Sequence, residues 1–172
     1  MKMKIYRMNE NAELPTYATE GSAAFDIKSC FKRGDKLRAY NNWNKEVFIT
    51  VKGVGQNPNS FQLPPDTRIL IPTGLIFDVP DKHVLKMFIR SSVALKRGLV
   101  LANGTGIIDS DYVEQTYIMI NNETDSLAVI SDGERLAQCV LEKTQQVKIS
   151  ETKTQPNQKT DRDGGFGSTG VK

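Results

Sequence analysis

The chain has 172 residues, a formal net charge of +3 and an apolar content of 38%, which is enough for a real core and excludes global disorder. So small a charge, spread over scattered lysines and arginines, gives no reason to expect nucleic-acid binding. Because the chain has no long apolar run and no apolar leader, we expect neither a membrane span nor a secretory signal. Two distant cysteines, Cys30 and Cys139, indicate a reduced, cytoplasmic protein.

Strand signals dominate the chain, and helical periodicity is scarce. Short apolar or alternating runs, each bounded by Gly, Pro, Asn or Asp, lie at residues 3–8, 23–30, 46–53, 68–80, 84–91, 99–104, 116–123, 127–131 and 136–150. Residues 91–98 predict the one helix, with Ser91 or Ser92 as its N-cap and Gly98 at its end. We therefore predict an all-β jelly roll or β-clip barrel with one short helix.

The chain divides into a β domain over residues 1–150 and a polar linker with a glycine-rich tail over residues 151–172. Within the first part, residues 32–60 form a polar insertion that carries the only tryptophan, Trp43. A surface excursion is the simpler interpretation of this insertion, and a partner-binding arm is the alternative.

Residues 103–112, NGTGIIDSDY, are the densest in candidate chemistry. The dipeptide Asn103-Gly104 is typical of a hairpin turn, and Gly106 permits a close approach of the backbone. Asp109 and Asp111 share a face if the segment is extended. Two such carboxylates suit a metal site or a general base with a helper, and a plain polar turn is the alternative.

Other stretches also carry polar groups in apolar surroundings. Arg90, Ser91 and Ser92 stand where a strand meets the helix, a pattern typical of an anion site, although helix capping alone explains the serines. Gln138 lies in an otherwise apolar strand, for which a solvated edge strand is the simpler explanation. Asp26 is the single acid in another apolar stretch, where a buried structural carboxylate is the alternative.

In their order and spacing, five motifs of the chain resemble those of the trimeric dUTPase family. They are AAFDI (23–27), RSSVA (90–94), NGTGIIDSDY (103–112), GERLAQ (133–138) and GGFGSTG (164–170). The resemblance implies hydrolysis of dUTP to dUMP and pyrophosphate, with Mg²⁺ held by the phosphates and water and not directly by the protein. It further implies a homotrimer with C-terminal tail exchange, and an intracellular site of action (the host cell, if the source is viral).

The resemblance also implies roles for the catalytic and phosphate-binding residues. Asp109 would be the general base, and Asp26 would lie near the water shell of the metal. Gln138 would hold the attacking water or a phosphate, and Arg90, Ser91 and Ser92 would bind phosphates.

The same resemblance implies how the nucleoside is recognised. Backbone groups of the hairpin at Asn103, Gly106 and Ile108 would form hydrogen bonds with uracil. Cytosine would leave a buried polar group of the site unpaired and would therefore bind poorly. Tyr112 would stack under the deoxyribose and crowd out a 2′-hydroxyl.

In the tail, Phe166 would stack on uracil, and Gly167 and Ser168 would donate N–H groups to phosphates. Arg162 stands one residue closer to the glycines than in the family pattern R-G-x-G-G-F, which leaves its role toward the γ-phosphate open. A second departure is DYVEQ at residues 111–115, where the family has DYRG.

Two alternatives remain at the level of sequence. One is a dCTP deaminase, or a bifunctional relative, which shares the β fold and an RSS-like element. The other is a regulatory nucleotide-binding protein that acts on a protein partner through residues 32–60.

Overall fold

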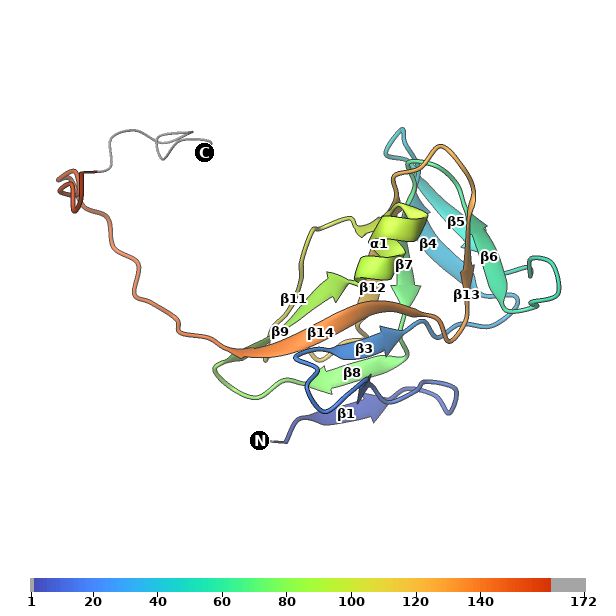
Figure 1. Ribbon diagram of the computed structural model, residues 1–172, viewed down its shortest axis with the longest axis horizontal. Coiled ribbons are helices and arrows are strands. Elements are labelled where there is room, and N and C mark those ends of the chain that lie inside the picture. Colours follow the sequence, from blue (N-terminus) through green and yellow to red (C-terminus); the bar gives the residue numbers. More distant parts are fainter. Residues whose placement is uncertain (1, 162–172) are drawn as a thin grey trace.

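The computed structural model describes residues 2–161, which form an all-β protein with one short helix, as the sequence predicts (Figure 1). The helix is α1 (Ser91–Arg97). The strands, in chain order, are β1 (Lys4–Arg7), β2 (Thr16–Tyr17), β3 (Phe25–Lys28), β4 (Lys36–Tyr40), β5 (Glu46–Thr50), β6 (Ser60–Leu63), β7 (Arg68–Pro72), β8 (Leu75–Asp78), β9 (His83–Ile89), β10 (Leu99–Leu101), β11 (Gly106–Ile108), β12 (Tyr117–Asn122), β13 (Ala128–Ser131) and β14 (Arg135–Lys143).

The strands pair into two five-stranded sheets and two two-stranded ones. The larger sheets have the strand orders β10-β12-β7-β4-β5 and β11-β9-β14-β3-β2, and the smaller ones are β1-β8 and β13-β6. Every strand pairing is antiparallel, which suits strands that alternate between a buried and a solvated face. The expectation of a barrel is wrong in one respect, because the sheets of residues 2–161 do not close into a single barrel.

The core lies between the sheets and follows from the period of two along each strand. In β7 and β12, Ile69, Ile71, Ile118 and Ile120 are all buried, while their sequence neighbours face outward. Each such side chain contributes about 1.5–3 kcal/mol when it leaves water. The alternation therefore decides both the register and the inner face of each sheet.

Residues 32–60 are built into the fold, so the interpretation as a surface excursion holds only for part of them. Strand β4 pairs with both β5 and β7, and Leu37 and Ala39 belong to the core. The hairpin turn between β4 and β5 does lie at the surface, where Trp43 is exposed. This segment is therefore not a separable appendage, because its removal would take two of the five strands, β4 and β5, out of the sheet and uncover β7.

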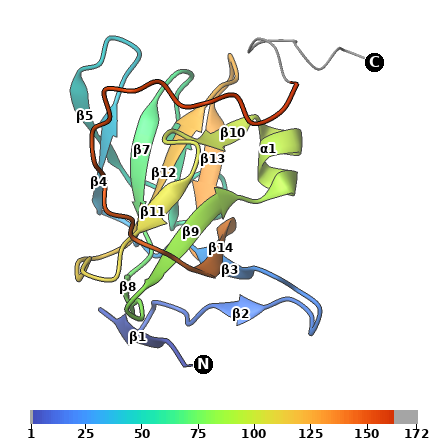
Figure 2. The ribbon, with the colours of Figure 1, turned by 90° about the vertical axis from the view of Figure 1, so that its left-hand side faces the viewer.

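Helix α1 follows directly from β9 (Figure 2). Its one buried residue is Val93. The expected serine cap is wrong, since Arg90 is the N-cap residue and no side chain caps the helix. Gly98 ends the helix as predicted, with a left-handed φ of 57°. A Cβ at this position would lie 2.4 Å from Thr124 Cγ2, so glycine is required by space as well as by backbone conformation.

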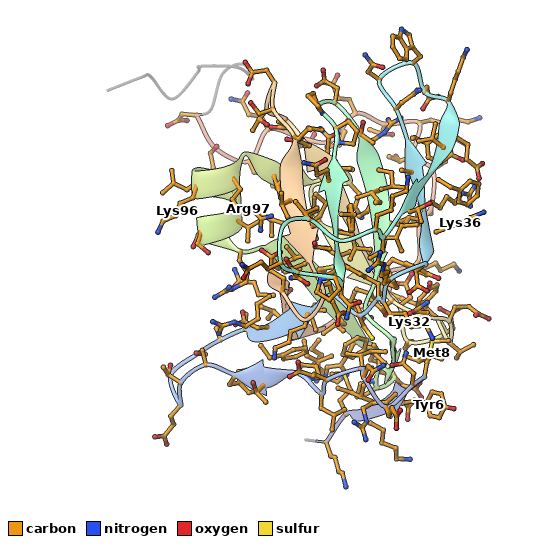
Figure 3. The ribbon with its side chains drawn as sticks, turned by 90° about the vertical axis from the view of Figure 1, so that its right-hand side faces the viewer. Tyr6, Met8, Lys32, Lys36, Lys96 and Arg97 are labelled. Carbon is orange, nitrogen blue, oxygen red and sulfur yellow. The ribbon has the colours of Figure 1, made fainter. Side chains whose placement is uncertain are left out.

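Arg97 fixes the helix to the turn between β13 and β14 (Figure 3). Its guanidinium forms an ion pair with Glu134 and donates to the carbonyl of Val129. The other carboxylate oxygen of Glu134 accepts the N–H of Ser131 at 3.1 Å. These contacts hold the end of the helix against β13 and the turn that leads into β14, the strand that carries Gln138.

Beyond β14 the chain leaves the body of the molecule (Figure 1). The predicted strand 136–150 ends at Lys143, and residues 144–161 contain neither helix nor strand. Val147 and Ile149 are exposed in this segment, with exposed fractions of 72% and 91%. In the described part of the chain, the seven residues of α1 are far too few for a helix that crosses a membrane.

Candidate active site

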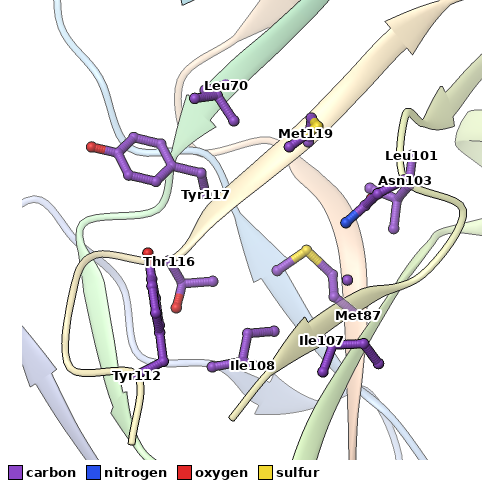
Figure 4. Close-up of a pocket in the computed structure, with 11 residues that line it drawn as sticks. Leu70, Met87, Leu101, Asn103, Ile107, Ile108, Tyr112, Thr116, Tyr117 and Met119 are labelled. Atoms are coloured by element: carbon purple, nitrogen blue, oxygen red, sulfur yellow. The ribbon is translucent and has the colours of Figure 1, made fainter.

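A pocket of about 400 Å³ opens between β11 and β12, in the size range of small-molecule sites (Figure 4). The residues that line it come from β7, β9, β10, β11, β12 and the loops around them: Leu70, Met87, Leu101, Asn103, Gly106, Ile107, Ile108, Tyr112, Thr116, Tyr117 and Met119. Figure 4 shows Tyr112 and Tyr117 on one side of the pocket and Leu101 and Asn103 on the other. Four residues proposed from the sequence, Asn103, Gly106, Ile108 and Tyr112, therefore meet in one cavity.

A tight turn leads from β10 into β11 and forms one wall of the pocket. The expectation of a hairpin at Asn103-Gly104 is wrong, because β10 pairs with β12 and β11 pairs with β9 in the other sheet. Gly104 has a φ of 69° and donates its N–H to the carbonyl of Leu101 at 2.9 Å, as expected of a turn glycine. Gly106 pairs with Met87 of β9, and a Cβ on Gly106 would lie 3.0 Å from the Met87 Cβ. Glycine at residue 106 therefore lets the turn lie close against β9 and keeps the cavity open.

Asp109 lies directly after β11, at the surface and outside the core. Asp109 and Asp111 would share a face only if their segment were extended. Residues 109–112 instead form a turn, in which Tyr112 N–H donates to the Asp109 carbonyl at 3.2 Å. Both carboxylates are solvent-exposed. An accessible carboxylate next to a pocket is placed to act as a general base toward water.

Tyr112 forms another wall of the pocket, and its hydroxyl donates to the carbonyl of Gln115 at 2.8 Å. Partial burial raises the pKa of Tyr112, and the nearby Tyr117 and Glu114 raise it further. The phenol therefore stays protonated at neutral pH and acts as a hydrogen-bond donor.

A second cluster lies on the other side of the β11-β9-β14-β3-β2 sheet from the core. Asp26 is 14% exposed and forms ion pairs with Arg90 (Oδ1 to Nε, 3.0 Å) and Arg135 (Oδ2 to Nη1, 3.1 Å). Gln138 is the cross-strand partner of Asp26, and Ser91 and Ser92 follow Arg90 with exposed side chains. The cluster therefore presents two arginines and two hydroxyls at one surface, a combination suited to an anion.

Sequence reasoning missed two features of these sites. A solvated edge strand was the simpler explanation for the strand of Gln138, but β14 pairs with both β3 and β9 and is the middle strand of its sheet. In the same strand, Arg135 forms an ion pair with Asp26, more than a hundred positions earlier in the chain. Sequence reasoning also missed the pocket residues of β7 and β12, such as Leu70 and Met119. The alternation along β7 and β12 indicates that Leu70 and Met119 point away from the core. Only the pairing of the strands shows which cavity these side chains face.

The pocket and the Asp26 cluster are separate within one chain. Strands β9 and β14 lie between β11 and β3, and no residue is common to the pocket lining and the cluster. Arg162, Phe166, Gly167 and Ser168 lie outside the described residues. Across residues 2–161, no group of three or more His, Cys, Asp or Glu side chains is placed to hold a metal ion.

The family model for dUTPase matches residues 56–170, which is more than half of the chain. The deoxyuridine 5′-triphosphate nucleotidohydrolase of Finegoldia magna is 34% identical over 171 residues, covering 99% of both chains. That of Hydrogenobaculum sp. is 30% identical over the full length of both chains. Among solved structures, the fold is similar to that of a Staphylococcus bacteriophage 80alpha dUTPase mutant with dUpNHpp, with a TM-score of 0.73, 21% identity and 99% coverage of both chains.

The bacterial relatives match along their whole length, and the family model spans the turn, the pocket and the fourth motif. These likenesses agree with the five motifs found in the sequence. The chain belongs to the dUTPase family.

Proposed function

We propose that this protein hydrolyses dUTP to dUMP and pyrophosphate by attack of water on the α-phosphorus. The observation that carries the proposal is the placement of an exposed carboxylate, Asp109, directly beside a closely lined pocket that ends at Ile108. In this reaction a bond forms between the water oxygen and phosphorus, the bond from phosphorus to the leaving pyrophosphate breaks, and the proton of water passes to Asp109. This substrate places the activity inside the cell.

The pocket is suited to the uracil of this substrate. Asn103 and Gly106 line the pocket, and backbone donors and acceptors there would recognise the edge of a base that offers an N–H and a carbonyl oxygen. Gly106 and Met87 lie close together in the pocket wall, and we expect that wall to leave little room for an added 5-methyl group. The ring of Tyr112 provides the flat wall on which a deoxyribose packs.

The triphosphate requires cationic groups, and no lysine or arginine of residues 2–161 lines the pocket. We therefore propose a homotrimer in which the surface at Arg90, Ser91 and Ser92 of one copy faces the pocket of another, with Gln138 beside the attacking water. Exposed apolar side chains around the pocket, including Ile107 (55%) and Val113 (70%), favour coverage by a second copy.

The C-terminal segment supports an exchange between copies. Residues 144–161 extend away from their own domain, and Val147 and Ile149 stand two residues apart, on one face of an extended chain. Burial of these side chains against a neighbouring copy would offset the cost of ordering the segment. We further propose that Phe166, Gly167 and Ser168 then cover the bound nucleotide, with Arg162 near the terminal phosphate.

Mg²⁺ fits this arrangement through the substrate. The carboxylate of Asp26 is already paired with two arginines, and Mg²⁺ is commonly held by substrate phosphates and water with few protein ligands. When bound, Mg²⁺ neutralises charge that develops on the phosphoryl oxygens. Asp26 serves in this scheme to order Arg90 and the water shell of the metal.

The test is a hydrolysis panel with dUTP, dCTP, dTTP and UTP, each with and without Mg²⁺, together with Asp109→Asn. We expect efficient release of pyrophosphate from dUTP alone, and a loss of about 10²–10⁴ in kcat for Asp109→Asn with little change in substrate binding. Asp125→Asn, a substitution of an exposed aspartate in the turn after β12, is the matched control and keeps wild-type turnover. Release of ammonia from dCTP, or an active Asp109→Asn, would refute the proposal.

A further inference from the structure

The loop that carries Asp109 and Tyr112 is held in place by a residue to which no motif assigns a role. We propose that Gln115 is a positioning residue that sets the ring of Tyr112 at the pocket wall and thereby determines how well the site distinguishes deoxyribose from ribose. This inference rests on the proposed function, because it takes the Tyr112 wall as the place where the sugar packs.

The ring of Tyr112 has little packing to hold it. Tyr112 is 39% exposed, and the residues on either side of it, Asp111 and Val113, are exposed too. Two hydrogen bonds instead fix its two ends: the backbone N–H donates to the Asp109 carbonyl at 3.2 Å, and the hydroxyl donates to the Gln115 carbonyl at 2.8 Å. The position of the ring therefore depends on where the backbone of Gln115 is held.

The side chain of Gln115 holds that backbone from two directions. Its Oε1 accepts the N–H of Gly74 at 2.9 Å, and its Nε2 donates to the hydroxyl of Tyr117 at 2.8 Å. One amide thus joins the loop both to the turn between β7 and β8 and to the second tyrosine of the pocket. The backbone of the neighbouring Thr116 is fixed at the same place, because its N–H donates to the Leu75 carbonyl at 2.9 Å and its carbonyl accepts the Thr73 hydroxyl at 2.6 Å. The Gln115 amide adds to these bonds the contact that lies nearest to Tyr112 in the chain.

Gly74 is a firm anchor for this network. It has a φ of +67°, and a Cβ at this position would lie 2.8 Å from the Ala12 Cβ, so the turn packs directly against the N-terminal segment. The carbonyl of Gly74 also accepts the N–H of Met8 at 2.9 Å. A chain of contacts therefore runs from the N-terminal segment through Gly74 and Gln115 to Tyr112.

A network of this kind affects specificity more than turnover. Discrimination against a 2′-hydroxyl requires a ring that does not yield, because a wall that moves outward leaves room for the extra oxygen. Loss of the Gln115 amide frees the loop at two points while the carboxylate of Asp109 stays in the chain. We therefore expect a larger effect on KM and on the choice between sugars than on kcat.

The experiment compares kcat and KM for dUTP and UTP in the wild type and in Gln115→Ala. We expect the ratio of kcat/KM for dUTP over that for UTP to fall about five- to tenfold, the effect of losing about one hydrogen bond, with most of the change in KM. Gln115→Glu keeps an acceptor for the Gly74 N–H and should recover most of the ratio. Gln56→Ala, at an exposed glutamine of the loop before β6, is the matched control.

The outcomes separate this inference from the function on which it rests. A wild-type protein that does not cleave dUTP removes both. The positioning role alone is overturned if the wild-type enzyme cleaves dUTP and Gln115→Ala has the same specificity ratio and the same KM. This holds even if Gln115→Ala has a lower melting temperature. If Gln115→Ala does not fold, Gln115→Asn withdraws the amide from the Gly74 N–H by one methylene and must show the same fall in ratio.

Discussion

The ion pairs of Asp26 allow a quantitative prediction for Asp26→Asn. The substitution keeps the shape of the side chain and removes its charge, so that Arg90 and Arg135 lose their shared partner. The loss is unequal for the two arginines, because the side chain of Arg90 is 27% exposed and that of Arg135 is 52% exposed.

The magnitude follows from these exposures. A hydrogen-bonded pair with a charged group contributes about 1.5–3 kcal/mol when it is shielded, which describes the contact to Arg90. An exposed pair such as that to Arg135 contributes about 0.2–1 kcal/mol. We therefore expect Asp26→Asn to lower the free energy of unfolding by about 2–3 kcal/mol, or the melting temperature by about 5–10 °C for a domain of this size.

The assay is urea unfolding followed by circular dichroism at one fixed protein concentration, because any assembly makes the transition depend on concentration. Glu13→Gln is the matched control, since its ion pair with Lys28 involves side chains that are 55% and 34% exposed. That substitution should cost less than about 1 kcal/mol and become neutral at high salt. An equal loss in the two variants would refute the view that partial burial strengthens the Asp26 contacts.

Three further predictions concern the pocket and the core. Thr116→Val should be neutral or stabilising in thermal melts, because the Thr116 Oγ1 is buried without a hydrogen-bond partner and valine has nearly the same shape. A loss of more than about 1 kcal/mol in the free energy of unfolding would contradict this. Gly106→Ala should raise KM for dUTP at least about tenfold in steady-state assays, because a methyl group there meets Met87. An unchanged KM would mean that Met87 moves aside and the pocket keeps its shape. Burial strongly raises the pKa of the Cys139 thiol, so unfolding releases a proton at high pH that the folded state retains. Stability should therefore fall by up to about 1.4 kcal/mol per pH unit above about pH 9 in urea titrations, and Cys139→Ala should reduce this slope.

Local pattern was sufficient for most of the secondary structure. The alternation in β7 and β12, the turn signal at Asn103-Gly104 and the glycine that ends α1 each follow from the period of apolar residues and from backbone preferences. The same reasoning failed for β4, where the run from Lys36 to Tyr40 alternates but contains only one large apolar side chain, Leu37. A small residue such as Ala39 is buried there because β5 and β7 cover it, and a sequence pattern does not record that cover.

The candidate site divides in the same way. The motifs identified the residue types, among them Asp109, Tyr112 and Arg90, because carboxylates, aromatic rings and guanidinium groups at these spacings carry recognisable chemistry. They did not indicate that Asp26 is held by Arg135 or that Gln115 supports the loop. Side-chain periodicity tells which face of a strand is apolar, whereas contacts between distant segments depend on pairing and register. Only the tertiary structure decided those, because many different pairings satisfy the same local pattern.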